Sequence, residues 1–260
     1  MLQNPVKAKL RAGHTVAGPI IAEARSIGTV KLMAREGFDF LFLDMEHALY
    51  DWETILTLVQ SSLVMDIVPI VRVTDLSYQL VARALDTGAR GVIIPRVETA
   101  EQVADAVSYA KYPPLGRRGA GGDGRMGYER LSPAQVVEIS NAETMVIVQV
   151  ETEIGLANLE AMASVPGVDV ICVGPQDLSI SLGVTGNFEH PTFVSAMERV
   201  ATVCAAHGVA SGMVERDAAD LKRWHDLGMR FLCCGTDAHF LARGASESVA
   251  TIQTFAVGAT

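Results

Sequence analysis

Apolar residues along the chain gather into eight short runs that alternate with segments of amphipathic, helix-like spacing. Five runs follow a glycine that ends a helical pattern, within residues 36–44, 87–95, 166–174, 207–214 and 227–235. Three more runs, at 15–22, 66–73 and 144–150, complete the set. Glycine is favoured just beyond a helix because it adopts the left-handed conformation without a steric clash. The pattern therefore predicts a repeated unit of helix, glycine turn and strand.

The predicted strands are continuously apolar rather than alternating, which is typical of parallel strands buried on both faces. Helical stretches at 51–65, 77–87 and 100–112 lie between them and can serve as crossover connections. Eight such units in 260 residues predict an α/β protein with a closed (β/α)8 TIM barrel, formed as a single domain over residues 1–260. An open, doubly wound parallel sheet is the structural alternative.

One long, glycine-rich segment, residues 112–133, interrupts this rhythm. It contains four arginines and a literal GxGxxG motif: Arg117, Arg118, Arg125 and Arg130, with Gly119, Gly121 and Gly124. A dinucleotide-binding fingerprint needs a strand before it, whereas a helical pattern precedes this one, so we reject the Rossmann interpretation. The segment is either a mobile lid that meets an anionic ligand or a solvated loop.

Composition narrows the class of protein. With 49% hydrophobic residues, the chain can bury a large core without disulfides or a structural metal. A net charge of -9 and a pI near 5.1 argue against nucleic acid or an anionic membrane surface as a partner. The four cysteines show no CxxC spacing, so we expect buried thiols in a reducing compartment. The N-terminal residues 1–13 contain no apolar core of signal-peptide length, and nowhere do 18 apolar residues run together, so we expect a cytoplasmic protein.

Candidate chemistry follows the predicted strands, because catalytic groups of such barrels sit where strands end. Four neighbouring strand ends deliver polar or turn-forming residues: Asp44, Glu46 and His47; Arg72; Gln149 and Glu151; Gly174, Pro175 and Asp177. Each residue alone has an ordinary explanation, such as a helix-capping carboxylate, a core histidine or a structural arginine. Their convergence on one rim of the barrel weakens these explanations together.

Paired carboxylates with open positions suit a hard divalent cation such as Mg²⁺ or Mn²⁺. A 2-oxo acid can offer such a cation its carboxylate and its C2 carbonyl, and the cation would stabilise the enolate formed at C2 and C3. Arg72 is placed to add fixed positive charge beside the C2 oxygen. The alternative Schiff-base route needs a lysine inside the barrel. None of the lysines lies in a predicted strand: Lys7, Lys9, Lys31, Lys111 and Lys222.

A resemblance to a known family rests on five stretches, "FLFLDMEHA", "PIVRV", "YPPLGRRG", "VQVET" and "VGPQDLSISLG". In this order, from about residue 15 to about residue 245, they resemble the motif series of the HpcH/HpaI family. These are metal-dependent class II pyruvate aldolases, including 4-hydroxy-2-oxoheptanedioate and 2-dehydro-3-deoxyglucarate aldolases. The resemblance implies a barrel of the phosphoenolpyruvate/pyruvate type and a lyase that reversibly cleaves 4-hydroxy-2-oxo acids to pyruvate, or hydroxypyruvate, and an aldehyde.

The same resemblance implies roles for individual residues. Glu151 and Asp177 would be the protein ligands of the cation, which would be Mg²⁺, Mn²⁺ or Co²⁺, and Arg72 would contact the C2 oxygen of pyruvate. Three further positions would line the pyruvate site: Gln149, Gly174 and Pro175. The resemblance also implies a homo-hexamer, a dimer of trimers, in which the last helix is exchanged between protomers. The apolar residues 247–257 suit such packing.

Proton transfer is implied for His47, oriented by Asp86. This chain departs from the family pattern after "YPPLGRRG" and at Met45, where a glycine is usual, so the acceptor aldehyde stays open. Two rival functions also stay open. Oxaloacetate decarboxylation would pass through the same enolate, and a non-enzymatic barrel would bind an oxo acid as a sensor or scaffold.

Overall fold

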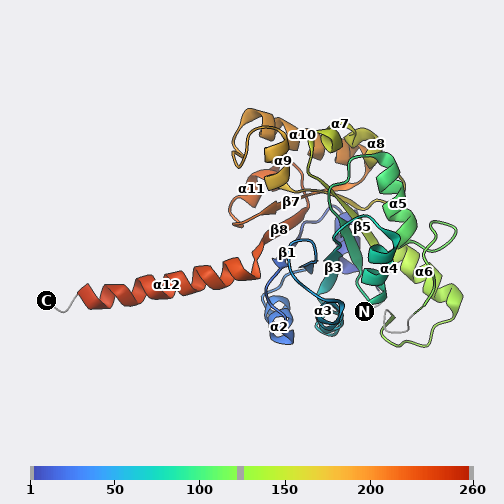
Figure 1. Cartoon of the computed structure of the whole chain (residues 1–260), viewed down its shortest axis with the longest axis horizontal. Helices are drawn as coiled ribbons and strands as arrows, with labels where there is room; N and C mark the ends of the chain where they lie inside the picture. Colours follow the sequence, from blue (N-terminus) through green and yellow to red (C-terminus); the bar gives the residue numbers. More distant parts are fainter. Residues whose placement is uncertain (1–2, 122–125, 258–260) are drawn as a thin grey trace.

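Eight parallel strands close into a barrel in the order in which they occur along the chain. A computed structural model describes residues 3–121 and 126–257 (Figure 1). The strands are β1 (Val16–Ile21), β2 (Phe40–Asp44), β3 (Val68–Arg72), β4 (Gly91–Ile94), β5 (Met145–Val150), β6 (Val170–Val173), β7 (Ala210–Glu215) and β8 (Phe231–Thr236). Each predicted run corresponds to one strand, although β7 and β8 extend one residue beyond their runs. The predicted (β/α)8 barrel is confirmed, and the open sheet is excluded because β1 pairs with β8.

Helices surround the barrel and one precedes it. They are α1 (Pro5–Arg11), α2 (Ile27–Arg35), α3 (Trp52–Val64), α4 (Tyr78–Asp86), α5 (Ala100–Ala110), α6 (Pro133–Glu143), α7 (Glu153–Ala157), α8 (Leu159–Ala163), α9 (Pro175–Ser181), α10 (Pro191–His207), α11 (Leu221–Asp226) and α12 (Asp237–Val257). Side-chain oxygens of Asp51, Ser77 and Thr99 accept backbone N–H groups at the starts of α3, α4 and α5. Such caps satisfy donors that a helix start leaves unpaired.

Two apolar layers explain why the strands read as unbroken hydrophobic runs. In β2, Phe40 and Phe42 belong to the cluster inside the barrel, whereas Leu41 and Leu43 pack in the larger cluster toward the helices. The rings of Phe40 and Phe231 stack across the interior with centroids 4.4 Å apart. All four cysteines are free thiols, and only Cys234 is not fully buried. Both faces of each strand are therefore occupied by side chains.

Two buried lysines, one of them in α1, lie at the end of the barrel where the strands begin. Lys7 Nζ lies 3.0 Å from Asp169 Oδ1, and Lys7 and Lys111 both donate to the Thr144 carbonyl, at 3.0 and 2.6 Å. Lys111 Nζ also donates to the carbonyl of Asn141 at 2.8 Å. Burial, with a contribution from Lys7, lowers the pKa of Lys111 to about 7. Both lysines lie at the end opposite to the strand termini that carry the predicted chemistry.

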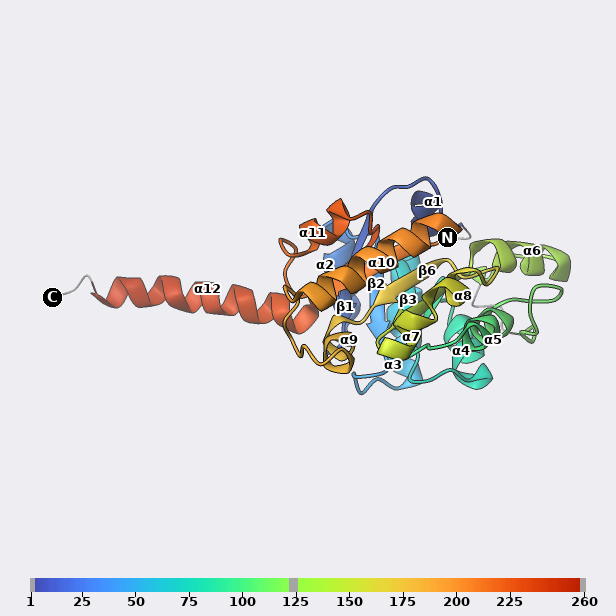
Figure 2. The ribbon, with the colours of Figure 1, turned by 90° about the horizontal axis from the view of Figure 1, so that it is seen from above.

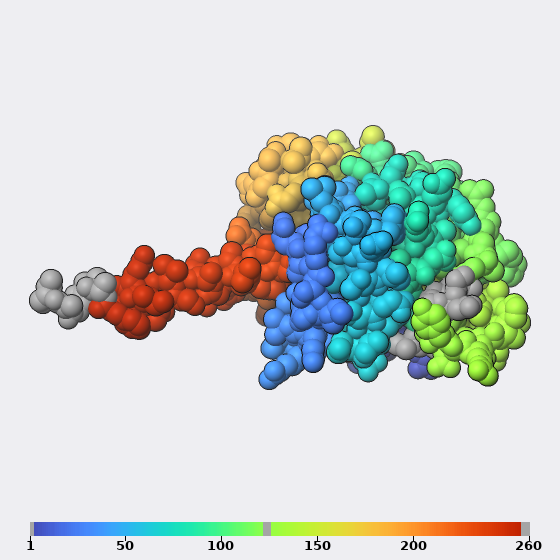
Figure 3. All heavy atoms as spheres, turned by 60° about the horizontal axis from the view of Figure 1, so that its bottom comes forward, coloured from blue at the N-terminus to red at the C-terminus, as the bar shows by residue number. Residues whose placement is uncertain are grey.

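The last helix, α12, leaves the barrel. Figures 1 and 2 show it projecting from the body of the molecule, and Figure 3 shows the same in space-filling form. Asp237 anchors its start by accepting N–H groups of residues 22–24, which follow β1. Beyond that anchor, Leu241 and Phe255 are 77% and 70% exposed. Exchange of α12 between protomers stays a prediction. In the part of the chain that the structure describes, no helix is long and apolar enough to cross a membrane.

Residues 112–133 were predicted to be a lid or a solvated loop. The described residues of this segment follow α5 or precede α6 and thus lie where helices return to the strand starts, away from the carboxyl ends of the strands. Arg118 is 4% exposed and donates to Asp86, while Arg117 stacks over the Tyr109 ring with its Cζ 4.8 Å from the ring centre. None of the described residues of this segment lines the cavity at the other end. Within one chain it is therefore not a lid over that cavity; Gly124 and Arg125 lie outside the described residues.

Candidate active site

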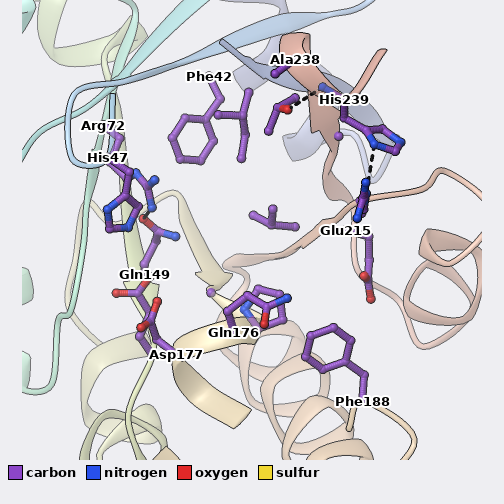
Figure 4. Close-up of a pocket in the computed structure, with 18 of the residues that line it drawn as sticks. Phe42, His47, Arg72, Gln149, Gln176, Asp177, Phe188, Glu215, Ala238 and His239 are labelled. Atoms are coloured by element: carbon purple, nitrogen blue, oxygen red, sulfur yellow. Dashed lines mark hydrogen bonds between the residues drawn. The ribbon is translucent and has the colours of Figure 1, made fainter. Parts of the chain in front are cut away.

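A cavity of about 590 Å³ opens at the carboxyl ends of the strands. Seven of the eight predicted site residues line it: His47, Arg72, Gln149, Glu151, Gly174, Pro175 and Asp177. Figure 4 shows Arg72, His47, Gln149 and Asp177 on one wall, facing Phe188 and His239 across the cavity. A volume of this size suits a small-molecule ligand. None of the five lysines is part of its lining in the single chain.

Arg72 is held in a fixed orientation by a carboxylate on the neighbouring strand. Its Nε and Nη2 donate to Asp44 Oδ1 and Oδ2 at 2.8 and 2.7 Å, and Nη1 donates to Gln149 Oε1 at 3.3 Å. Asp44 and Arg72 are the last residues of β2 and β3 and are paired in register. Burial lowers the pKa of Arg72, but the hydrogen bonds and charge of Asp44 outweigh it, so that the net shift is upward. A bidentate pair of this kind keeps the guanidinium both charged and oriented.

Asp44 was among the residues at the predicted strand ends but had no predicted role. The signal was available, because Asp44 and Arg72 end two consecutive strands that a parallel barrel must place side by side. Glu46 was likewise left without a role. Its Oε2 lies 3.2 Å from Arg72 Nη1, and its Oε1 lies 3.4 Å from Arg96 Nη2. The positive charge of Arg72 is therefore shared between two carboxylates before any ligand binds.

Glu151 is fixed by two backbone features. Its Oε2 accepts the backbone N–H of Arg96 at 2.8 Å, and Arg96 has a φ of 51°, in the left-handed region. Gly174 approaches from the other side, where an added Cβ would lie 2.3 Å from Glu151 Oε1. Burial raises the pKa of Glu151, and the charges of Glu46 and Asp177 raise it further, while the Arg96 N–H and Arg72 lower it. Burial and the neighbouring carboxylates therefore disfavour the charged form of Glu151, and a bound cation would favour it.

That donor set fits a hard divalent cation. Glu151 and Asp177 come from adjacent positions on the rim, after β5 and in the first turn of α9, and both line the cavity. Among residues 3–121 and 126–257, no group of three or more His, Cys, Asp or Glu side chains could hold a metal ion. A cation held by Glu151 and Asp177 alone would keep positions for water and substrate oxygens, as magnesium sites commonly do. Which cation binds, and whether these two residues hold it, stays a prediction.

His47 and Asp86 are not brought together within one chain. His47 lies at the mouth with a side chain 65% exposed, and its nearest carboxylate is Glu46, 3.8 Å from Nε2 to Oε2. Asp86 is the last residue of α4, at the opposite end of the barrel, where it binds Arg118 at 2.8 Å. A helix that returns to the start of the next strand carries its last residue away from the active rim. The single chain therefore gives no support to Asp86 as the group that orients His47.

The wall of the cavity opposite Arg72 was not predicted. It is formed by Glu215, Arg216 and His239 at the ends of β7 and β8, and by Phe188 from the segment between α9 and α10. Glu215 is buried and accepts the indole N–H of Trp224 at 2.7 Å; burial raises its pKa. Arg216 could have been found from the sequence, because it lies two residues beyond the predicted run 207–214.

The chain resembles known proteins of one family. Residues 23–244 match the family described as HpcH/HpaI aldolase/citrate lyase. The chain belongs to this family. A 4-hydroxy-2-oxo-heptane-1,7-dioate aldolase of Salmonella typhimurium is 33% identical over 249 residues, covering 96% of this chain and 94% of that protein. A hydroxypyruvate/pyruvate aldolase of Cupriavidus necator is 33% identical over 250 residues, covering 96% and 93%.

Solved structures agree with this family assignment. An HpcH/HpaI aldolase from Desulfitobacterium hafniense superimposes with a TM-score of 0.91 at 33% identity, covering 95% of this chain and 96% of that one. The family match begins after β1 and ends within α12, so it includes every strand end from β2 to β8. The resemblance predicted from the five motifs is confirmed.

Proposed function

We propose that this HpcH/HpaI family member is a divalent-metal-dependent class II pyruvate aldolase. It would reversibly cleave 4-hydroxy-2-oxo acids to pyruvate, or hydroxypyruvate, and an aldehyde. The family and the named relatives support a carbon–carbon lyase of the aldolase type. The observation that carries the finer proposal is the arrangement of Arg72, locked by Asp44, on one wall with Glu151 and Asp177.

A divalent cation held by Glu151 and Asp177 would supply positive charge to the carboxylate and C2 oxygens of the bound oxo acid. Arg72 adds a fixed charge of the same sign from β3. Cleavage breaks the C3–C4 bond, and its electron pair enters the C2 enolate, so negative charge grows on the C2 oxygen. Because Asp44 already holds the guanidinium, little reorganisation is needed as that charge develops. One such donor contributes about 10²- to 10³-fold to the rate.

Two proton transfers complete the reaction. The 4-hydroxyl loses its proton as C4 becomes the aldehyde carbon, and C3 gains a proton to give the methyl group of pyruvate. His47 is proposed to exchange these protons with solvent, since it lies at the open mouth beside the Glu46 carboxylate. A histidine suits this task because its unperturbed pKa lies close to neutral pH.

Assembly is a separate part of the proposal. A homo-hexamer, in which α12 of one protomer packs on another, would cover the exposed Leu241 and Phe255. Static light scattering of the purified chain measures this directly. Leu241→Asp combined with Phe255→Asp should shift the protein to smaller species, and an unchanged mass would contradict the proposed role of α12.

Carbon–carbon bond formation tests the catalytic proposal. The protein, supplied with Mg²⁺ or Mn²⁺, is incubated with pyruvate and a panel of aldehydes, and the aldol product is followed by chromatography. Oxaloacetate consumption is measured in parallel, because decarboxylation leaves the same enolate and is the rival reaction. Turnover of oxaloacetate with no aldol product from any aldehyde would favour the rival. Absence of both reactions would favour a non-catalytic oxo-acid-binding protein.

Arg72→Ala supplies the internal check. It should abolish aldol formation while leaving cation affinity nearly unchanged, because the guanidinium serves the developing enolate rather than the cation. Arg35→Ala is the matched control, since Arg35 is exposed in the last turn of α2, remote from the cavity. Equal loss of activity and of cation affinity in Arg72→Ala would mean that Arg72 has another role.

A further inference from the structure

Arg216 is held in place by His239 on the wall opposite Arg72. Its Nε donates to His239 Nδ1 at 3.0 Å, and His239 Nε2 lies 3.3 Å from Asp217 Oδ1. Because Nδ1 accepts a hydrogen bond, the proton of the neutral ring lies on Nε2, which can donate to Asp217. The Nε edge of the guanidinium is thus occupied by the histidine. The edge formed by Nη1 and Nη2 stays open for a planar acceptor.

The positive charge of Arg216 is not paired with a carboxylate among the described residues, whereas that of Arg72 is. Among the described residues, no carboxylate oxygen lies within 4.0 Å of the nitrogens of Arg216. Arg72 forms a bidentate pair with Asp44, and the nearby Arg223 and Arg243 each pair with acidic side chains. Arg216 lines the cavity and is exposed to its solvent.

The position of Arg216 defines what it can reach. Strands β3 and β7 lie four places apart in a closed barrel of eight, so their ends face each other across the mouth. A substrate whose reacting carbons lie beside Arg72 therefore extends its far end toward Arg216. Phe188 lines the cavity on the same side as His239 and offers an apolar surface for the intervening chain (Figure 4).

We propose that Arg216, oriented by His239, binds a carboxylate at the far end of the acceptor aldehyde and makes the enzyme selective for such acceptors. This inference rests on the proposed aldolase function. A carboxylate matches the open fork of the guanidinium and carries one negative charge. A doubly charged phosphate fits less well, because Asp217 lies beside His239 and Glu215 lines the same wall.

Acceptor pairs that differ only in charge test the proposal. With pyruvate and Mg²⁺, the wild-type protein should use succinic semialdehyde with a higher kcat/KM than butanal, its neutral counterpart. Arg216→Met should lower kcat/KM for succinic semialdehyde roughly 10- to 100-fold and change that for butanal by less than about threefold. Arg35→Met, which removes one charge from the exposed end of α2, is the matched control and should change neither.

Several results would overturn the inference. They are equal use of both acceptors by the wild-type protein, a parallel loss of both in Arg216→Met, or a preference for glyceraldehyde 3-phosphate over succinic semialdehyde. Arg216→Lys keeps the charge but not the forked guanidinium, so it should lose part of the selectivity for the charged acceptor. If Arg216→Met does not fold, the selectivity of Arg216→Lys tests the proposal instead. A wild-type protein that joins pyruvate to no aldehyde would instead refute the proposed function itself.

Discussion

Replacing Gly174 by alanine tests how closely the site depends on the position of Glu151. Gly174 has φ -91° and ψ 95°, which alanine adopts without strain, so the substitution acts only through its Cβ. That Cβ would lie 2.3 Å from Glu151 Oε1 and 2.7 Å from Cγ, whereas real Cβ atoms keep at least 3.0 Å. The carboxylate must therefore move by roughly 0.7 Å or more.

The expected magnitude follows from this displacement. Movement of Glu151 also weakens the hydrogen bond from the Arg96 N–H to Oε2, now 2.8 Å long. A misplacement of about 1 Å at a catalytic site costs about 10²-fold in rate, which corresponds to roughly 2.7 kcal/mol. We expect Gly174→Ala to lower kcat/KM for aldol formation about 100-fold and to weaken binding of the divalent cation.

Steady-state aldol formation and a cation titration measure these effects, and thermal unfolding shows whether the variant is folded. Gly28→Ala is the matched control, because its Cβ would approach only the flexible Ser26 Oγ, at 3.2 Å, and alanine favours the helix in which it lies. A folded Gly174→Ala variant that keeps more than about a third of wild-type kcat/KM would refute the reasoning.

Three further outcomes are expected. Exhaustive chelation should abolish retro-aldol turnover and added Mg²⁺ or Mn²⁺ should restore it; turnover that survives chelation contradicts the proposed mechanism. Asp44→Asn should lower kcat/KM about 10- to 100-fold, because the amide cannot accept both N–H groups of Arg72; a change below threefold would show that Arg72 does not need this partner. The pKa of Lys111 is lowered from 10.5 to about 7, so between these values the unfolded chain binds a proton that the folded chain lacks, and stability rises with pH. The stability difference between the wild-type protein and Lys111→Met, followed by urea unfolding, should therefore grow by about 2 kcal/mol from pH 7 to pH 9; a constant difference would mean that Lys111 stays charged.

The barrel could be predicted from the sequence because glycines after helices and unbroken apolar runs each indicate one kind of local structure. The glycines between a helix and the next strand adopt positive φ values, at Gly37, Gly88, Gly167, Gly208 and Gly228. Unbroken apolar runs then required cover on both faces, which a barrel wrapped in helices provides. The direction of α12 was not accessible, because its apolar side chains specify that something covers them but not where the helix points.

The candidate site was accessible only as a set of strand ends. Arg72 ends a strand, and Glu151 and Asp177 follow strands, so topology alone places them on one rim. Distances within that rim depend on side-chain length and backbone turns, and the contact of Gly174 with Glu151 could not be read from spacing. Within one chain Asp86 lies at the end of α4, opposite the mouth, so its role toward His47 stays a prediction.

Arg216 and His239 were missed because their contact joins the residue after β7 to the first turn of α12. Nothing in the sequence shows that α12 begins directly after β8. A rule that treats every strand end alike, without weighting it by a known motif, would have included Arg216.

Exchange of the methyl protons of pyruvate tests the central claim most directly, because it reports the C2 enolate without any acceptor. Pyruvate, Mg²⁺ and the protein are placed in D₂O, and loss of the methyl signal is followed by proton NMR. The account predicts rapid exchange with the wild-type protein and none above background with Arg72→Ala or Glu151→Gln. Undiminished exchange in either folded variant, or its absence in the wild-type protein, would contradict it.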